Sequence, residues 1–128
     1  MRVLIVKTSS MGDVVHALPA VSDLARQRPG TVIDWVVEEA FVEIPRLHRD
    51  VARVLPIGLR RWRGQLHLPS TWKQMRAARQ ALREVHYDRI LDLQGLLKSA
   101  CIARWAPARS GPPRYCGSAV GTICQNTP

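Results

Sequence analysis

Apolar residues along the chain fall into two kinds of segment, short continuous runs and longer stretches with helical spacing. The short runs are rich in Val, Ile and Leu and predict four strands, at 2–6, 31–37, 53–57 and 88–93. The longer stretches predict helices, at 13–28, 38–47 and 71–85, and a further helix is expected to begin within 94–105. Strands that alternate with helices in this way indicate an α/β fold, a Rossmann-like parallel sheet with helices on both faces.

Two of the predicted helices have features that a structure can test, a proline inside 13–28 and the division of 71–85 into an apolar and a basic side. Pro19 lies inside the first helical pattern, and because proline has no N–H we expect it to break or kink this helix, with its first turn as a separate piece. In 71–85, one face carries the apolar side chains that we assign to the core: Trp72, Met75, Ala78, Leu82 and Val85. The other side carries Arg76, Arg79 and Arg83.

In open parallel sheets, ligands bind beyond the carboxyl ends of the strands. Three polar segments follow predicted strands and should meet at that edge, namely 7–13, a basic loop over 58–70, and 92–95. Residues 107–128 differ in composition, with four of the nine prolines, two of the three cysteines and no acidic residue. We therefore expect one domain over 1–106 and a poorly ordered tail over 107–128.

Charge narrows the choice of partner. The chain has 19 Lys plus Arg against 10 Asp plus Glu, and the excess lies after residue 52, where 13 basic residues face 3 acidic ones. Such a one-sided excess favours nucleic acid, an anionic membrane surface or a phosphorylated substrate, although a solvated basic face has the same composition. No apolar run approaches the length of a membrane span or of a signal-peptide core, so a cytoplasmic protein is expected. Three cysteines without CxxC spacing argue against a disulfide framework and against a zinc site.

The stretch "KTSSMGDVV" (7–15) ends the first predicted strand. Ser9, Ser10 and Gly12 place backbone N–H groups next to a helix N-terminus, which favours anions, but the spacing is not that of a phosphate-binding loop. Asp13 has three open roles here. It can stabilise the first turn of the helix, accept a proton as a general base, or pair with Lys7.

Two further motifs carry candidate chemistry. In "RRWR", the guanidinium groups of Arg60, Arg61 and Arg63 could together bind phosphate or carboxylate groups. Single-stranded nucleic acid is a rival ligand for the same residues. The structural alternative is an exposed loop whose Trp62 side chain packs in the core. In "DLQGLLKSA" (92–100), a glycine directly after a strand permits a tight turn, and the next helix carries Lys98 and Ser99 in its first turn, where they contact an anion or are simply exposed. The four histidines are scattered without ligand spacing.

Four blocks together, "MRVLIVKTSSMGDVVHALPAV", "DWVVEEAF", "IGLRRWR" and "YDRILDLQGLLKSA", resemble the N-terminal domain of the bacterial lipopolysaccharide heptosyltransferase I family. The resemblance runs in register from residue 1 to about 106. It implies a GT-B glycosyltransferase fold, in which a first Rossmann-like domain holds the lipid acceptor and a second holds ADP-heptose. The implied reaction is transfer of heptose to a Kdo hydroxyl of Kdo2-lipid A, with inversion, without a metal or other cofactor, at the cytoplasmic face of the inner membrane and without nucleic acid.

The resemblance also implies roles for individual residues. It makes Asp13 the general base, and it gives the acceptor site Ser9, Ser10, Met11, Gly12, Arg60, Arg61 and Arg63. We expect support for that site from Lys7, Gln94, Gly95 and Lys98. Gly64 stands where the family pattern leads us to expect a basic residue.

By that resemblance the chain is shorter than a family member, and we expect its donor domain to be missing, through a frameshift or a premature stop. We therefore expect little or no transferase activity from the 128-residue chain alone. The alternative function is a basic Rossmann-like module that binds nucleic acid or anionic lipid, which accounts for the charge but not for "KTSSMGD".

Overall fold

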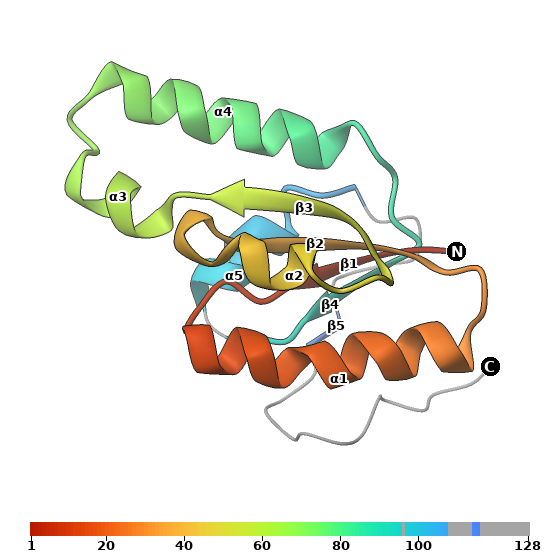
Figure 1. The fold of residues 1–128 in the computed structure, drawn as a ribbon. Coiled ribbons are helices and arrows are strands. Elements are labelled where there is room, and N and C mark those ends of the chain that lie inside the picture. Colours follow the sequence, from red (N-terminus) through yellow and green to blue (C-terminus); the bar gives the residue numbers. More distant parts are fainter. Residues whose placement is uncertain (96, 108–113, 116–128) are drawn as a thin grey trace.

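We describe a computed structural model of the chain, which defines residues 1–95, 97–107 and 114–115 (Figure 1). Its elements run in the order β1 (Arg2–Val6), α1 (Met11–Gln27), β2 (Val32–Glu38), a 3₁₀ turn η1 (Glu39–Phe41), α2 (Glu43–Arg46), β3 (Val51–Ile57), α3 (Leu59–Gly64), α4 (Pro69–Arg83), β4 (Arg89–Asp92), α5 (Leu97–Ala103) and β5 (Arg114–Tyr115). The predicted tail contributes β5, and its residues 108–113 and 116–128 lie outside the described part of the chain.

All strand pairs are parallel, and the sheet order is β3-β2-β1-β4-β5. Because successive side chains along a strand point to opposite faces of the sheet, β1 contributes side chains to two hydrophobic cores. Val3 and Ile5 pack with the apolar face of α1, whereas Leu4 and Val6 pack with residues of α4 and α5. Figure 1 shows α1 and α4 on opposite sides of the sheet. The predicted Rossmann-like α/β sheet with helices on both faces is confirmed.

Helix α1 runs without interruption through Pro19, so the prediction that its first turn forms a separate piece was wrong. Proline removes one backbone hydrogen bond, to the carbonyl of Val15, but both residues are exposed and water can reach that carbonyl. The buried face of the helix compensates for the lost bond, because its four buried side chains lie on one stripe against the sheet: Val14, Ala17, Val21 and Leu24.

The basic segment also differs from its prediction as a loop, because "LRRWRG" is the helix α3. Leu59 and Trp62, three residues apart, pack toward the core, and Trp62 is buried. The carboxylate of Glu38 accepts a hydrogen bond from the backbone N–H of Arg60 at 3.2 Å and so holds the first turn. Two anchored apolar side chains in six residues are too few to show a helical period in the sequence.

Trp72 was wrongly assigned to the core. Its side chain is about half exposed, whereas Thr71, Leu82 and the partly buried Met75 form the inner face of α4. At 100° per residue, Trp72 lies on the same stripe as Arg76, Arg79 and Arg83, about a quarter-turn from that inner face. The three arginines lie outside the core, as predicted, and all are exposed, but they share their stripe with Trp72.

A buried polar cluster holds β2 to β1 and to the segment before β4. Asp34 is fully buried, and its carboxylate accepts hydrogen bonds from the Arg2 guanidinium at 3.0 to 3.3 Å and from the Tyr87 hydroxyl at 3.0 Å. Burial, and then the Asp34 charge, raise the pKa of Tyr87 far above its usual range. The phenol therefore stays protonated and donates a hydrogen bond to Asp34.

Tyr87→Phe is expected to lower the free energy of unfolding by about 1–2 kcal/mol, because Asp34 loses one of its donors in a buried position. Urea unfolding followed by circular dichroism measures the change. Ser22→Ala is the comparison, since it removes a hydroxyl that contacts the partly buried His48 ring at 2.8 Å and touches no buried charge. Equal losses in the two variants would show that Asp34 does not depend on Tyr87.

Candidate functional site

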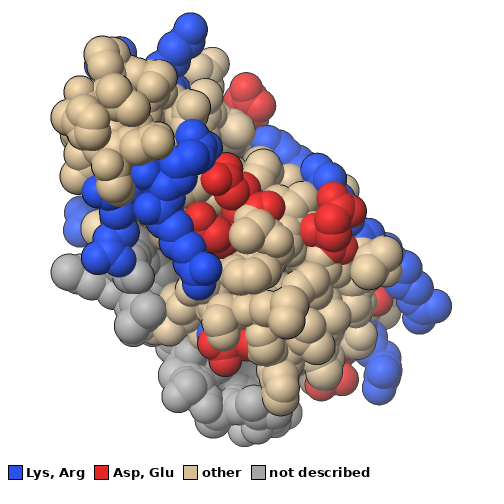
Figure 2. All heavy atoms as spheres, turned by 60° about the vertical axis from the view of Figure 1, so that its left-hand side comes forward, with Lys and Arg blue, Asp and Glu red and all other residues tan. Residues whose placement is uncertain are grey.

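The parallel strands β1, β3 and β4 end at one edge of the sheet, so the segments 7–13, 58–70 and 92–95 follow strand ends on the same edge, as the sequence predicted. The side-chain carbonyl of Gln94 accepts hydrogen bonds from the backbone N–H groups of Thr8, at 3.2 Å, and Ser9, at 3.4 Å. The Lys7 ammonium donates to the carbonyl of Leu93 at 3.3 Å. The loop after β1 is therefore fixed to the loop after β4. Figure 2 turns this edge of the molecule forward and shows acidic side chains beside a cluster of Lys and Arg.

Asp13 lies in the first turn of α1, behind the N-cap residue Ser10. One carboxylate oxygen, Oδ2, accepts hydrogen bonds from the backbone N–H and from the hydroxyl of Ser10, both at 3.1 Å. The backbone bond first, then the hydroxyl bond and the charge of Lys7, hold the pKa of Asp13 below its usual value. Asp13 is therefore an ionised carboxylate at neutral pH, exposed to solvent.

This geometry bears on the three roles considered for Asp13. The stabilising role in the first turn is observed. An ion pair with Lys7 is not present among the described residues, because the Lys7 ammonium contacts the carbonyl of Leu93 instead. The role as a base stays a prediction. It is compatible with the structure, since the second oxygen, Oδ1, has no hydrogen bond from the described part of the chain.

Glu38, the last residue of β2, and Glu39, directly after it, belong to this edge and were not among the predicted site residues. Glu38 is only 3% exposed; its N–H donates to the carbonyl of Thr8 at 3.0 Å, and its carboxylate accepts from the N–H of Arg60. Burial raises the pKa of Glu38 despite that hydrogen bond. The sequence did hold a signal, because two adjacent acidic residues after the apolar run "VIDWVV" must lie at the carboxyl edge of the sheet.

Glu39 binds the middle arginine of the basic helix. Both nitrogens of one side of the Arg61 guanidinium donate to the two carboxylate oxygens of Glu39, each at 3.0 Å. Arg61 also donates to the side-chain carbonyl of Gln74, which accepts from the Trp62 indole as well. Gly58 permits this packing, because a Cβ there would lie 3.0 Å from the Arg61 guanidinium and 3.2 Å from Glu39. The guanidinium of Arg61 is thus held by the protein itself.

The guanidiniums of the two other arginines of α3 form no ion pair with a carboxylate among the described residues. The guanidinium of Arg60 lies 5.7 Å from the centre of the Phe41 ring, a cation–π distance. The side chain of Arg63 makes no ion pair or hydrogen bond with the described part of the chain. Both side chains are exposed, so they are available to an anionic ligand.

The remaining predicted site residues have simpler positions. Met11 and Gly12 are exposed in the first turn of α1, and Gly95, with φ +67, forms a turn in which the Asp92 carboxylate accepts from the N–H groups of Gln94 and Gly95 at 2.9 and 3.1 Å. Lys98 lies in α5, but its side chain is outside the described atoms. Among the described residues, no group of three or more His, Cys, Asp or Glu side chains is placed to hold a metal ion.

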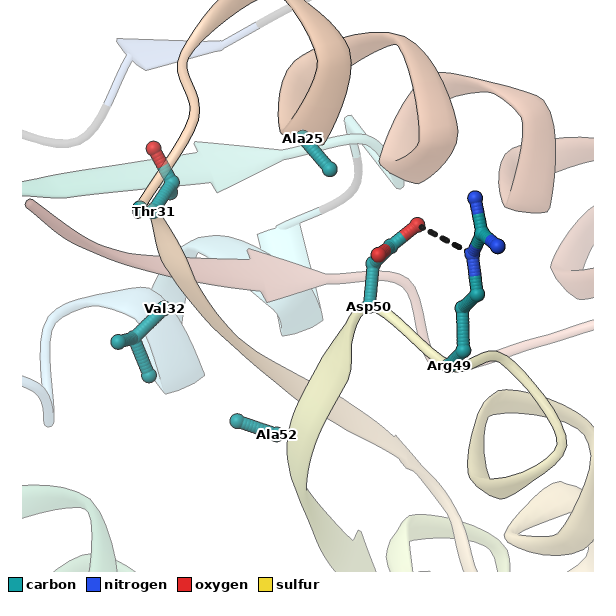
Figure 3. A pocket seen from close by; sticks show the side chains of 7 residues that line it. Ala25, Thr31, Val32, Arg49, Asp50 and Ala52 are labelled. Carbon is teal, nitrogen blue, oxygen red and sulfur yellow. Dashed lines mark ion pairs between the residues drawn. The ribbon is translucent and has the colours of Figure 1, made fainter.

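A hollow of about 310 Å³ lies elsewhere, near the amino ends of β2 and β3, and Figure 3 shows its lining. Its charged groups, Arg49 and Asp50, pair with each other at 3.8 Å. It is remote from the edge where ligands bind in parallel α/β sheets, so we do not assign it a site. None of the described helices is long and apolar enough to cross a bilayer.

Known proteins resemble this chain in sequence. Residues 75–112 match the family model for glycosyltransferase family 9 (heptosyltransferase). Over 105 residues the chain is 55% identical to lipopolysaccharide heptosyltransferase 1 of Pseudomonas aeruginosa, a match that covers 82% of this chain and 30% of the relative. Over 102 residues it is 51% identical to the Escherichia coli protein of the same name, covering 80% of this chain and 32% of the relative.

Over these residues the chain is similar to the family 9 heptosyltransferases. Its fold matches a solved structure of the E. coli heptosyltransferase WaaC with ADP-2-deoxy-2-fluoro heptose, with a TM-score of 0.82 and 47% sequence identity. That match covers 91% of this chain and 36% of the solved chain. The chain thus spans about a third of the length of its relatives, and it resembles them in both sequence and fold.

Proposed function

We propose that this chain forms the acceptor-binding part of a lipopolysaccharide heptosyltransferase I, at the cytoplasmic face of the inner membrane. The observation that carries the proposal is an ionised carboxylate, Asp13, on the same sheet edge as two arginines without carboxylate partners, Arg60 and Arg63, in a chain 55% identical to such an enzyme. The acceptor would be Kdo2-lipid A, whose phosphate and carboxylate groups suit guanidinium ligands.

The proposed chemistry is a single displacement. A sugar hydroxyl is a poor nucleophile until its proton is accepted. Oδ1 of Asp13 takes the proton of a Kdo hydroxyl while the hydroxyl oxygen forms a bond to the anomeric carbon of the heptose. The bond from that carbon to the phosphate oxygen breaks, and ADP leaves with the electron pair. Attack opposite the leaving group inverts the anomeric centre.

The hydrogen bonds of Asp13 suit the proposed role of its carboxylate as the general base. The two Ser10 hydrogen bonds both use Oδ2, so they fix the carboxylate and leave Oδ1 for the substrate. In the free chain the depressed pKa of Asp13 keeps its carboxylate ionised but makes it a weak base. Bound acceptor would shield the carboxylate from water and so raise its pKa toward a value more effective for catalysis. The donor nucleotide would be held by the portion of the relatives that this chain does not match, and no metal ion would take part.

The test is a transferase assay with ADP-heptose and Kdo2-lipid A. A chimera in which residues 1–106 replace the matching segment of the E. coli relative, 51% identical, supplies the remainder of the enzyme. We expect turnover by the chimera within tenfold of the relative, no loss in EDTA, and none by the 128-residue chain alone. A chimera that is folded by circular dichroism but inactive would refute the proposal. Salt-dependent binding of random oligonucleotides by the chain would favour nucleic acid as its partner instead.

A further inference from the structure

One segment of the molecule is basic and carries exposed apolar side chains at its tip. Residues 59–83, which include α3 and α4, hold seven Lys and Arg residues and no Asp or Glu. Of the large hydrophobic side chains that the described part of the chain exposes, three lie close together in the turn between these helices and at the start of α4: Leu66 at 51%, Leu68 at 36% and Trp72 at 52%. We call these three residues the apolar corner.

The geometry of Trp72 makes this corner more apolar than its exposure alone indicates. The indole N–H donates to the backbone carbonyl of Leu66 at 2.9 Å, so its one polar group is already bonded within the protein. The exposed remainder of the ring has nothing to gain from hydrogen bonding to water. The same bond ties the start of α4 to the preceding turn, which holds Leu66 and Trp72 together as one surface.

The charge next to the corner is arranged along α4. Arg76, Arg79 and Arg83 follow Trp72 at intervals of four, three and four residues, so one stripe of the helix begins with the indole and continues with three exposed guanidiniums. In Figure 1 the turn between α3 and α4 is the leftmost point of the molecule. In Figure 2, where that side is forward, an uncharged projection at the upper left is bordered by Lys and Arg.

We propose that the apolar corner inserts into the surface of an anionic lipid bilayer, with the arginines of α4 against the headgroups. Trp and Leu beside cations are the side chains that suit the bilayer interface, where the ring enters the acyl boundary and guanidiniums bind lipid phosphates. A nucleic-acid partner would use the charge but leave the two leucines without a role. The inference deepens the proposed function, because it names the surface by which the protein contacts the membrane. It rests on the proposed function only for the identity of that membrane.

The experiment is co-sedimentation of the full 128-residue chain with vesicles of phosphatidylglycerol and phosphatidylethanolamine, against vesicles of phosphatidylcholine. These vesicles contain neither acceptor nor donor, so the outcome is independent of transferase activity. We expect binding to the anionic vesicles only. The double variant Leu66→Ser/Trp72→Ser should bind at least tenfold more weakly, from the apolar surface removed.

Two matched variants separate the contributions. Leu47→Ser removes the most exposed leucine of the described residues, 86% exposed and remote from the corner in sequence, and should bind as the unchanged chain does. Arg76→Gln/Arg79→Gln should weaken binding by about 25-fold at low salt, at roughly fivefold for each headgroup contact, and by much less in 0.5 M salt. Because all these positions are exposed, circular dichroism should show that every variant stays folded, although Trp72→Ser also removes the indole bond to Leu66.

Three results would overturn the proposal. The first is absence of binding to anionic vesicles by the folded chain. The second is an equal loss from Leu47→Ser and from Leu66→Ser/Trp72→Ser, which would make the effect one of general hydrophobicity. The third is binding of a random oligonucleotide in preference to vesicles, unaffected by Leu66→Ser/Trp72→Ser, which would assign the basic surface to nucleic acid.

Discussion

Replacing Asp13 by Asn in the chimeric transferase is expected to lower kcat about a thousandfold, with little change in the KM for the lipid acceptor. An amide cannot accept the proton of the attacking hydroxyl, and general base catalysis typically contributes a factor of this order. The amide oxygen can still accept the backbone N–H of Ser10, which is the largest cause of the depressed pKa, so the start of α1 should stay in place. Steady-state kinetics at saturating ADP-heptose measures both constants.

The pH dependence gives this prediction a second readout. The base must be ionised, so activity that depends on Asp13 falls as the pH drops through its pKa. Because that pKa lies below the usual aspartate value of 3.8 in the free chain, kcat/KM should show no loss from Asp13 between pH 5 and 7. The same sign governs stability. The ionised carboxylate stabilises α1 above the aspartate pKa of the unfolded chain, and that contribution is lost in stronger acid.

A different outcome would reassign Asp13. If Asp13→Asn keeps kcat within about threefold, the residue is not the base. If Asp13→Ala then lowers only the free energy of unfolding, its role is confined to the first turn of α1. Ser10→Ala is the control, because it removes the hydroxyl donor to Oδ2 but retains the backbone donor. It should move kcat far less than Asp13→Asn.

The sequence predicted what depends on local periodicity and on the direction of parallel strands. The apolar run 2–6 is β1 as predicted, and the loops after β1 and β4 meet because carboxyl ends of parallel strands share an edge. It failed where tertiary contacts decide. Pro19 is tolerated because the buried face of α1 outweighs one lost hydrogen bond, and "LRRWRG" is helical because Glu38 and the buried Trp62 anchor it.

The pairing of charges was the part of the candidate site least visible in the sequence. Three arginines in four residues read as one anion clamp, but Glu39, 22 residues earlier, binds Arg61 and leaves Arg60 and Arg63 without carboxylate partners in the described part of the chain. No spacing rule connects positions in two different elements, so the division among these arginines emerges only from the fold. It leads to a second prediction with a large effect.

Arg60→Ala/Arg63→Ala in the chimera is expected to raise the KM for Kdo2-lipid A by a hundredfold to a thousandfold, with kcat changed less than tenfold. Each guanidinium would lose a charge-assisted contact with an anionic group of the acceptor, and such contacts are the strong ones. Arg61→Ala should raise that KM by less than tenfold, because the Arg61 guanidinium already donates to Glu39 and Gln74. Its main effect should be on thermal unfolding.

Glu39→Gln tests whether Arg61 is occupied by its ion pair with Glu39 or binds the acceptor. The change weakens the ion pair and frees the guanidinium of Arg61 on the edge where Arg60 and Arg63 lie, while it removes a negative charge from the neighbourhood of an anionic substrate. The KM for the acceptor should then stay the same or fall, and the Arg61→Ala substitution should cost more in this background than alone. If Arg61→Ala by itself raises KM as much as the Arg60/Arg63 pair does, the acceptor displaces Glu39. All three arginines would then bind it together.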